Sequence, residues 1–217
     1  MKSRSTEPEL LDLETPPREM MARVVGYLRF VNRWLGGTRA VAHHLKEIRE
    51  PVTVLDVGAG GADVPSELAR RFPNLRPVAL DLSEMMLSFV EGMPRVRGDV
   101  LRLPFRDRGV DYVISSNFFH HLSDDQAVAA LRECDRIARR GIVINDLLRK
   151  RMAVFWIKVF TLWANPYVKA DGPQSVRRGF TAEEAEALAR RAGLHWLRVT
   201  RHLGYRFTLA GERPQGF

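Results

Sequence analysis

VLDVGAGGAD, residues 54–63, joins a hydrophobic strand that ends in an acid, Asp56, to a glycine-rich turn and the start of a helix. Glycine is needed at Gly58 and Gly60 because a side chain there would keep the backbone from closely approaching a ligand at the carboxyl end of a sheet. The stretch therefore predicts a ligand-binding loop after the first strand of an α/β sheet.

Outward from this loop, short β-rich runs alternate with helical stretches, which predicts a parallel sheet covered by helices on both faces. The predicted strands are 52–57, 75–80, 95–98, 110–116, 141–145, 195–201 and 204–209. The predicted helices are 65–72, 83–91, 124–138 and 181–192, after one or two helices in 18–49 that break at Gly36-Gly37. The last two strands meet at Leu203-Gly204 and are expected to form an antiparallel hairpin at the sheet edge.

The chain divides into two expected parts. Residues 1–50 are predicted to form an N-terminal helical cap, and residues 51–217 the core. Within the core, residues 147–180 are too long for an ordinary connection between a strand and a helix, so we expect a lid insertion over the site.

Acidic residues follow three successive predicted strands: Asp56, Asp81 and Asp99. A carboxylate in the position of Asp81 can accept hydrogen bonds from both hydroxyls of a ribose. Asp63 stands where a dinucleotide-binding loop has its third glycine, and a carboxylate at the mouth of that helix would repel a pyrophosphate. The acids therefore favour a cationic ligand, such as a sulfonium that carries an ammonium group, over a dinucleotide.

Five segments in order, VLDVGAGGAD, VALDLSEMML, RGDVLRLPF, VDYVISSNFFHHL and GIVINDL, cover roughly residues 50–148. In these segments the chain resembles the class I S-adenosylmethionine-dependent methyltransferases. The resemblance implies a Rossmann-like, seven-stranded, mostly parallel sheet with an antiparallel C-terminal edge strand, helices on both faces and a helical lid. It also implies S-adenosylmethionine as cofactor and S-adenosylhomocysteine as product.

The resemblance assigns nine residues to the cofactor: Asp56, Gly58, Gly60, Asp81, Leu82, Met86, Asp99, Val100 and Asn117. Asp63 is added to these because of its negative charge. Asp56 and the two glycines would hold the methionine moiety, and Asp81 the ribose. Leu82 and Met86 would lie against the adenine, whose amino group Asp99 would bind while the backbone of Val100 donates. Asn117 would offer its backbone carbonyl to the ammonium group.

Three residues are candidates for acid–base chemistry on the acceptor. His120 and His121 follow the fourth strand, and an imidazole has an ordinary pKa near 6.5 that suits a general base. Asp146 ends the fifth strand and is expected to face the same crevice. The alternatives are structural: a histidine that packs or caps the next helix, and an aspartate that caps a helix or pairs with Arg149. No cluster with metal-ligand spacing is predicted.

The acceptor pocket is expected to be aromatic. Its expected lining residues are Tyr27, Phe30, Trp34, Trp156 and Arg177. A flat or lipophilic acceptor suits such walls, so we expect a small phenolic or quinol-like substrate methylated on oxygen. The NRWLGGTR segment and residues 171–180 are similar to methyltransferases of bacterial aromatic polyketide pathways. No N-P-P-Y tetrad follows the fourth strand, which argues against amino methylation of nucleic-acid bases.

Charge is distributed unevenly along the 217 residues. The net charge is +8, but residues 1–131 carry −1 and residues 132–217 carry +9. RNA or another macromolecule as acceptor is one alternative that this basic half leaves open, and a cofactor-binding protein without catalysis is another. We interpret the excess mainly as an arginine-rich surface, which makes a nucleic-acid partner less expected than a small molecule.

The remaining features concern location. No apolar run approaches the roughly 20 residues that span a bilayer, the N-terminus is polar where a secretory signal is apolar, and Cys134 is the one cysteine. These features predict a cytoplasmic protein with Cys134 in the core. The sequence does not indicate how many copies of the chain assemble.

Overall fold

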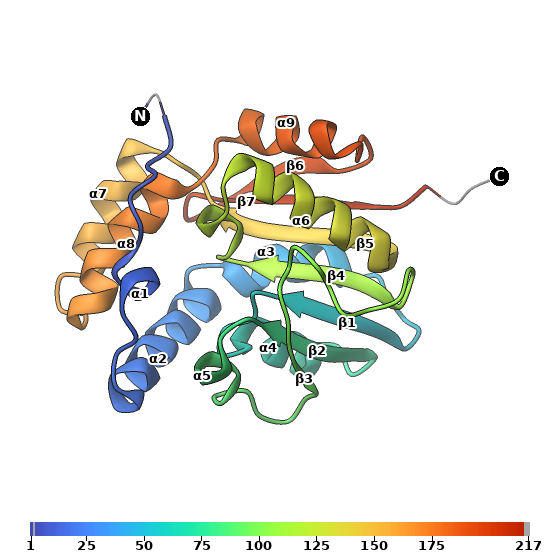
Figure 1. Cartoon of the computed structure of the whole chain (residues 1–217), viewed down its shortest axis with the longest axis horizontal. Coiled ribbons are helices and arrows are strands. Elements are labelled where there is room, and N and C mark those ends of the chain that lie inside the picture. Colours follow the sequence, from blue (N-terminus) through green and yellow to red (C-terminus); the bar gives the residue numbers. More distant parts are fainter. Residues whose placement is uncertain (2, 215–217) are drawn as a thin grey trace.

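A seven-stranded sheet forms the centre of the molecule in the computed structural model, which describes residue 1 and residues 3–214. The strands are β1 (Val52–Val57), β2 (Leu75–Asp81), β3 (Arg95–Arg97), β4 (Val110–Ser116), β5 (Ala138–Leu147), β6 (Arg198–His202) and β7 (Arg206–Glu212). Their order is β3-β2-β1-β4-β5-β7-β6. β1 to β5 pair in parallel, whereas β7 runs antiparallel to both β5 and β6 (Figure 1).

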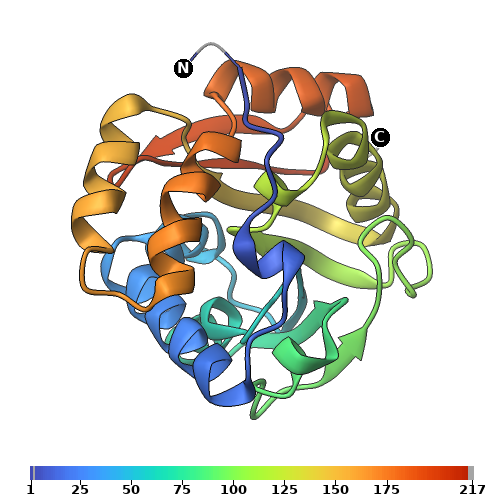
Figure 2. The same ribbon diagram turned by 60° about the vertical axis from the view of Figure 1, so that its left-hand side comes forward.

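Helices surround the sheet in three groups. They are α1 (Leu10–Leu13), α2 (Arg18–Trp34), α3 (Gly37–Leu45), α4 (Asp63–Arg71), α5 (Glu84–Leu87), α6 (Asp124–Ile137), α7 (Arg151–Phe160), α8 (Pro166–Arg178) and α9 (Ala182–Ala192), with a 3₁₀ turn η1 (Phe119–His121). α6 and α9 cover one face, and α3 and α4 the other. α1, α2, α7 and α8 gather beyond the carboxyl ends of the parallel strands, at the left of Figure 1 and in front in Figure 2.

The alternation of side chains along the strands builds a core on each face. In β1, Leu55 and Val57 pack toward α6 and α9, whereas Val52 and Val54 pack toward α3 and α4. Successive strand residues point to opposite faces, and all four of these side chains are buried. The central strands are therefore apolar on both faces, as expected of a parallel sheet sandwiched between helices.

The expected fold class is confirmed, including the C-terminal hairpin at the sheet edge. Within that hairpin β6 is the outermost strand, and the antiparallel strand β7 lies next to β5. The predicted helix 83–91 is wrong in its length, because α5 ends at Leu87. Beyond it, the N–H groups of Phe89 and Val90 donate to carbonyls three residues back, so the chain tightens into turns.

The segments that were expected to form a cap and a lid are helical. The insertion 147–180 folds into the antiparallel pair α7 and α8, with α8 on the inner side against α1, α2 and η1. Residues 1–50 separate into two groups: α1 and α2 lie with the lid helices, whereas α3 packs on the sheet against β5 and β7. Cys134 is buried in α6, and burial raises the pKa of its thiol to about 12.

Leu131 tests the core between α6 and the sheet. Its side chain is buried in the cluster that contains Leu55 and Ile142. Leu131→Ala should lower the free energy of unfolding by about 2–5 kcal/mol because it leaves a cavity. The exposed neighbour Arg132, whose guanidinium donates to the carbonyl of Arg191, is the control, and Arg132→Ala should cost at most about 1 kcal/mol. Equal losses in urea denaturation would contradict the assigned packing.

Candidate active site

The glycine loop is tightly packed from two sides. Gly58 has φ +67° and the ring of Phe118, from the loop after β4, lies directly over it, where a Cβ would clash. A Cβ on Gly61 would lie 2.5 Å from Cγ1 of Val25 in α2. The loop therefore needs glycine for its dihedral angles and for the close approach of its neighbours, and α2 covers it directly.

Asp56 ends β1 beneath this loop with its side chain almost fully buried. Its Oδ1 has no hydrogen-bond partner among the described residues. Burial first, and then the nearby carboxylates of Asp63 and Asp81, raise the pKa of Asp56 well above its ordinary value. An unsatisfied buried carboxyl oxygen that faces two other carboxylates is suited to a cationic ligand, so these residues fit the sulfonium and ammonium groups of S-adenosylmethionine.

Asp81 lies at the end of β2, beside the loop. Its Oδ2 accepts from the N–H of Gly60 at 2.8 Å, and its Oδ1 accepts from the N–H of Ser83 at 2.8 Å. Because each carboxylate oxygen can accept more than one hydrogen bond, acceptor capacity remains for ribose hydroxyls. Met86 lies next to Gly60, with its Cε 3.1 Å from the position of an added Cβ, whereas Leu82 is exposed.

The third acid lies farther out. Asp99 is exposed, and its Oδ1 accepts from the N–H of Leu101 at 2.9 Å. Val100 is buried behind it. The structure thus brings Asp56, Asp63 and Asp81 close together and leaves Asp99 at the rim of the same sheet edge.

A chain of hydrogen bonds crosses the carboxyl edge of the sheet from Asp63 to Arg206. Asn32 of α2 donates to Asp63 at 3.0 Å, Asn117 donates to Asn32 at 2.9 Å, and Arg206 of β7 donates to Asn117 at 2.6 Å. Burial raises the pKa of Asp63 and lowers that of Arg206 to about 10, which leaves Arg206 cationic at neutral pH. Asn32 and Arg206 were missed by sequence reasoning.

His120 is held by Asp146 on the inner side of η1. Asp146 Oδ1 lies 2.7 Å from His120 Nδ1, and Oδ2 accepts from the backbone N–H of His120 at 2.9 Å. Burial alone would lower the pKa of His120, but Asp146 and Glu9 outweigh it and raise that pKa to about 10. The structural alternative for Asp146, a pair with Arg149, is not formed, because Arg149 instead binds Glu184 of α9.

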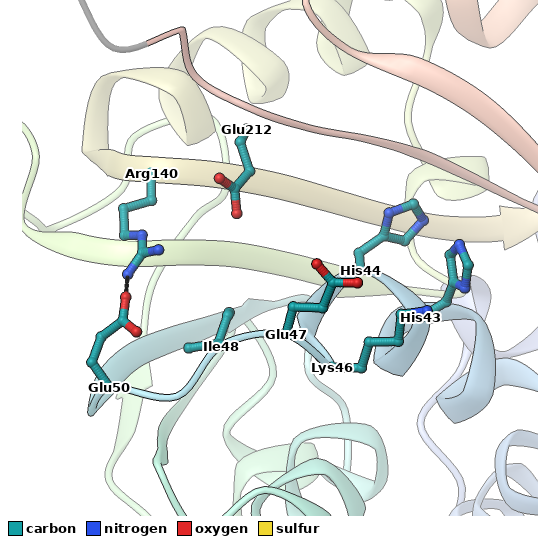
Figure 3. A pocket seen from close by; sticks show the side chains of 8 residues that line it. All are labelled: His43, His44, Lys46, Glu47, Ile48, Glu50, Arg140 and Glu212. Carbon is teal, nitrogen blue, oxygen red and sulfur yellow. Dashed lines mark hydrogen bonds and ion pairs between the residues drawn. The ribbon is translucent and has the colours of Figure 1, made fainter.

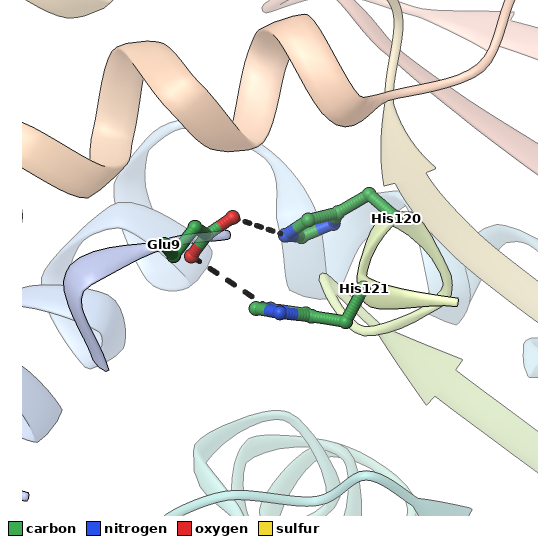
Figure 4. A group of neighbouring side chains, drawn as sticks. All are labelled: Glu9, His120 and His121. Atoms are coloured by element: carbon green, nitrogen blue, oxygen red, sulfur yellow. Dashed lines mark ion pairs between the residues drawn. The ribbon is translucent and has the colours of Figure 1, made fainter. Parts of the chain in front are cut away.

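The N-terminal segment supplies the other partners of the two histidines (Figure 4). Glu9 Oε1 lies 3.4 Å from His120 Nε2, and Glu9 Oε2 lies 3.8 Å from His121 Nε2. Asp12 Oδ1 lies 3.1 Å from His121 Nδ1. Both carboxylates have lowered pKa values: the histidines outweigh burial at Glu9, and the hydrogen bond from His121 is the largest cause at Asp12. We call Glu9, Asp12, His120, His121 and Asp146 the histidine latch.

The latch joins two histidines to three carboxylates. The imidazole rings of His120 and His121 lie against each other with centroids 4.3 Å apart and planes tilted by 33°. Glu9, His120 and His121 each bring one possible ligand atom to within 4.8 Å of the others, a grouping that a metal ion could also occupy. At His120 the carboxylates of Asp146 and Glu9 act as partners of the imidazolium, since, despite burial, they raise its pKa. Two of the three acids, Glu9 and Asp12, come from the N-terminal segment, for which the sequence predicted only a helical cap.

Arg178 binds the latch from α8. It donates to the backbone carbonyls of His120 and His121 at 3.2 and 2.8 Å and to Asp12 Oδ2 at 2.6 Å. Arg177, which was expected at the acceptor site, instead reaches Gln174 of its own helix at 3.5 Å. The contacts of Arg178 thus join the lid to η1 and to the N-terminal segment.

The aromatic residues expected to line a pocket point outward instead. Phe30, Trp34 and Trp156 are 55%, 67% and 42% exposed. Tyr27 is partly buried, and its hydroxyl donates to the carbonyl of Phe160 at 3.4 Å. The expectation that Phe30, Trp34 and Trp156 enclose an acceptor is wrong for this arrangement of the lid, because their helices turn other faces inward.

A different apolar cluster covers the glycine loop. Its buried members are Met21, Val24, Val25 and Val168, and partly buried side chains of α1, α2, α5 and α8, including Leu11, Met86, Phe89 and Tyr167, pack against them. The lid helices thus meet the loop through aliphatic and aromatic side chains. An acceptor that enters between lid and loop would meet an apolar wall.

Two cavities flank the sheet at opposite ends. One, of about 510 Å³, lies at the amino ends of the parallel strands, where His44, Glu50, Arg140 and Glu212 are among its lining residues (Figure 3). The other, of about 340 Å³, lies between α2 and α4, with Asp63 among its lining residues. The second cavity opens space up to the glycine loop, whereas the first is remote from it.

Comparisons with known proteins agree with this architecture. A family model described as a methyltransferase domain matches residues 54–141. Demethylmenaquinone methyltransferase of Roseiflexus castenholzii is 30% identical over 171 residues, which are 69% of this chain and 69% of that enzyme. The enzyme of the same name from Thermotoga maritima is 34% identical over 124 residues, or 54% of this chain; the match spans only 53%, about half, of that relative's length.

Among solved structures, an S-adenosylmethionine-dependent methyltransferase from Aquifex aeolicus superposes with a TM-score of 0.63 at 20% identity. The alignment covers 91% of this chain and 99% of that one, so the two share a fold. With the glycine loop, the three strand-end acids and the β3-β2-β1-β4-β5-β7-β6 sheet on the same chain, this chain belongs to the class I S-adenosylmethionine-dependent methyltransferases.

Proposed function

We propose that this chain transfers a methyl group from S-adenosylmethionine to an oxygen of a small phenolic or quinol-like acceptor. The observation that carries the proposal is the unpartnered, buried oxygen of Asp56 beneath the glycine loop, with an apolar lid over that loop. When bound, the cofactor supplies a methyl group on an electrophilic sulfonium. The chain has to bind both partners, align them and exclude water.

The cofactor roles proposed for the sheet edge follow from the positions of its acids. Asp56 would face the ammonium group beside the carbonyl of Asn117, and Asp81 would accept from the ribose hydroxyls. Met86 and Leu82 would flank the adenine, with Asp99 at its amino group. Asp63, at the start of α4, would add negative charge near the methionine end.

An apolar acceptor is supported by the cluster between lid and loop and by two of the relatives, which are named for demethylmenaquinone; other relatives are named as malonyl-acyl-carrier-protein O-methyltransferases. The charge pattern supports a small molecule rather than a nucleic acid. Many arginines of the basic half pair with carboxylates, among them Arg136, Arg140, Arg149, Arg201 and Arg213. Paired guanidinium groups have less free charge to offer a phosphate backbone.

His121 is the better candidate for a general base among the three residues considered. The side chain of His121 is 28% exposed, whereas those of His120 and Asp146 are almost fully buried and bound to each other. We propose that His120 acts as a fixed imidazolium that positions η1, and that Asp146 holds it there. His121 would take the proton of a phenol as its oxygen attacks the methyl group.

Asp81→Ala should weaken binding of S-adenosylhomocysteine by about 1–3 kcal/mol, because the ribose hydroxyls lose a partly buried, charged acceptor. Titration calorimetry measures the change directly. Glu84→Ala, three residues on at the exposed start of α5, is the matched control and should bind like the parent chain. Unchanged affinity in a folded Asp81→Ala protein would remove the ribose assignment.

Purified protein incubated with methyl-labelled cofactor should label phenols and reduced quinones and leave RNA unlabelled. His121→Ala should lower the rate and flatten its dependence on pH, because the base is lost. Turnover of RNA that falls steeply with salt would favour the macromolecular alternative. Tight cofactor binding without transfer to any acceptor would favour a non-catalytic role.

The paired His120 should also make stability depend on pH. Its pKa is raised from about 6.5 unfolded to about 10 folded, so its stabilisation is fully present below about pH 6.5 and is lost as pH rises toward 10. Asp146→Asn should remove most of that slope in urea denaturation across this range. The exposed acid Asp125 is the control, and Asp125→Asn should keep the slope. A slope that survives Asp146→Asn would contradict the assigned pair.

A further inference from the structure

An apolar stripe runs along the solvent side of α7 and into the turn that follows it. The members recur at helical spacing of three or four residues and are 42–89% exposed: Met152, Phe155, Trp156, Val159, Phe160 and Trp163. Large side chains at this spacing are ordinarily buried against a core. Here the whole stripe faces outward.

The other side of α7 already has its packing partner. Ala153 is buried, and Gly172 of α8 lies so close to Ile157 and Thr161 that an added Cβ would be about 3 Å from both. α7 therefore cannot bury the stripe by rotating without giving up its contact with α8. The stripe needs a partner outside the described chain, or it remains in water.

The segment that carries the stripe has charges of one sign. Between Asp146 and Asp171 the chain has no acidic residue, and Lys150, Arg151 and Lys158 are exposed on or beside α7. Such a helix, apolar along one face and cationic at its flanks, is complementary to a surface that is apolar inside and negatively charged outside. Long lysine and arginine stems can lie along the apolar surface while their charged ends reach the headgroups.

We propose that α7 docks this protein on the surface of an anionic lipid bilayer. The helix would lie in the plane of the interface, with Phe155, Phe160 and Trp163 among the acyl chains and Lys158 at the level of the lipid phosphates. No helix in the described residues is long and apolar enough to cross a membrane, so contact would be from one side. A second copy of this chain is a poorer partner, because pairing two stripes would bring like charges together.

Docking through α7 would place the lid at the lipid surface. α7 packs on α8, which contributes Val168 to the apolar cluster over the glycine loop and Arg178 to the histidine latch. An apolar acceptor dissolved in the bilayer would then reach the site without crossing water. This last consequence depends on the proposed acceptor, whereas docking itself does not.

Vesicle flotation of the full chain tests docking without any acceptor or cofactor. The protein should float with vesicles of phosphatidylcholine mixed with phosphatidylglycerol, and far less with phosphatidylcholine alone. Trp163→Ser and Phe160→Ser should each weaken binding about tenfold, because a buried ring is lost. Leu203→Ser is the matched control, since Leu203 is 94% exposed at the β6–β7 turn, and it should bind like the parent chain.

Charge reversal tests whether the cationic side chains beside the stripe contribute to membrane binding. Lys158→Glu should weaken binding to the anionic vesicles about tenfold at low salt, whereas Lys46→Glu, beyond α3, should have little effect. Absence of flotation, or equal losses for Leu203→Ser and Trp163→Ser, would overturn the proposal. The proposal would also be overturned if the protein did not bind vesicles and light scattering showed a dimer that Trp163→Ser converts to monomers. Because no methyl transfer is measured, failure here would leave the proposed reaction untouched.

Discussion

The position of η1 depends on one contact, the pairing of the Asp146 carboxylate with His120. Asp146 is buried near the end of β5. A buried charge is costly unless an opposite charge and hydrogen bonds satisfy it, and Asp146 receives both from His120 and a further N–H from Leu147. This contact fixes η1 to the sheet. Once η1 is in place, its outer side can bind Glu9 and Asp12, and the two backbone carbonyls can bind Arg178.

Local patterns predicted most of the sheet and the cofactor loop. Runs of β-branched residues bounded by turn signals located β1 and β4 at their observed ends, and β2 to within one residue. The loop was recognisable because its glycines, its acid and the following helix are consecutive in the chain. Asp81 could be added because a parallel sheet brings successive strand ends to one edge.

The rest depends on contacts between distant segments and on the direction of side chains. Glu9 and Arg206 are ordinary charged residues in the sequence, and only the folded chain brings one to His120 and the other to Asn117. Phe30 and Trp34 were correctly placed on a helix, yet composition cannot say which face of that helix is turned inward. For the same reason the sequence could not show that Arg178 contacts η1 while Arg177, about 100° away around the helix, contacts Gln174 of its own helix.

The hydrogen-bond chain from Asp63 to Arg206 has a consequence for how the two ligands are bound. Asn32 belongs to α2, which packs over the glycine loop, and Asp63 begins α4 directly after that loop, where we propose that it adds negative charge near the cofactor. A ligand that claims the carboxylate of Asp63 competes with the hydrogen bond that holds α2 down. Ligand binding at Asp63 and displacement of α2 would then be energetically coupled. By linkage, each process changes the equilibrium constant of the other by the same factor. An acceptor that displaces α2 would change the affinity for the cofactor, and the cofactor would change the affinity for the acceptor by the same factor. The two ligands would then bind cooperatively through the side-chain amide of Asn32, which contacts neither reacting atom.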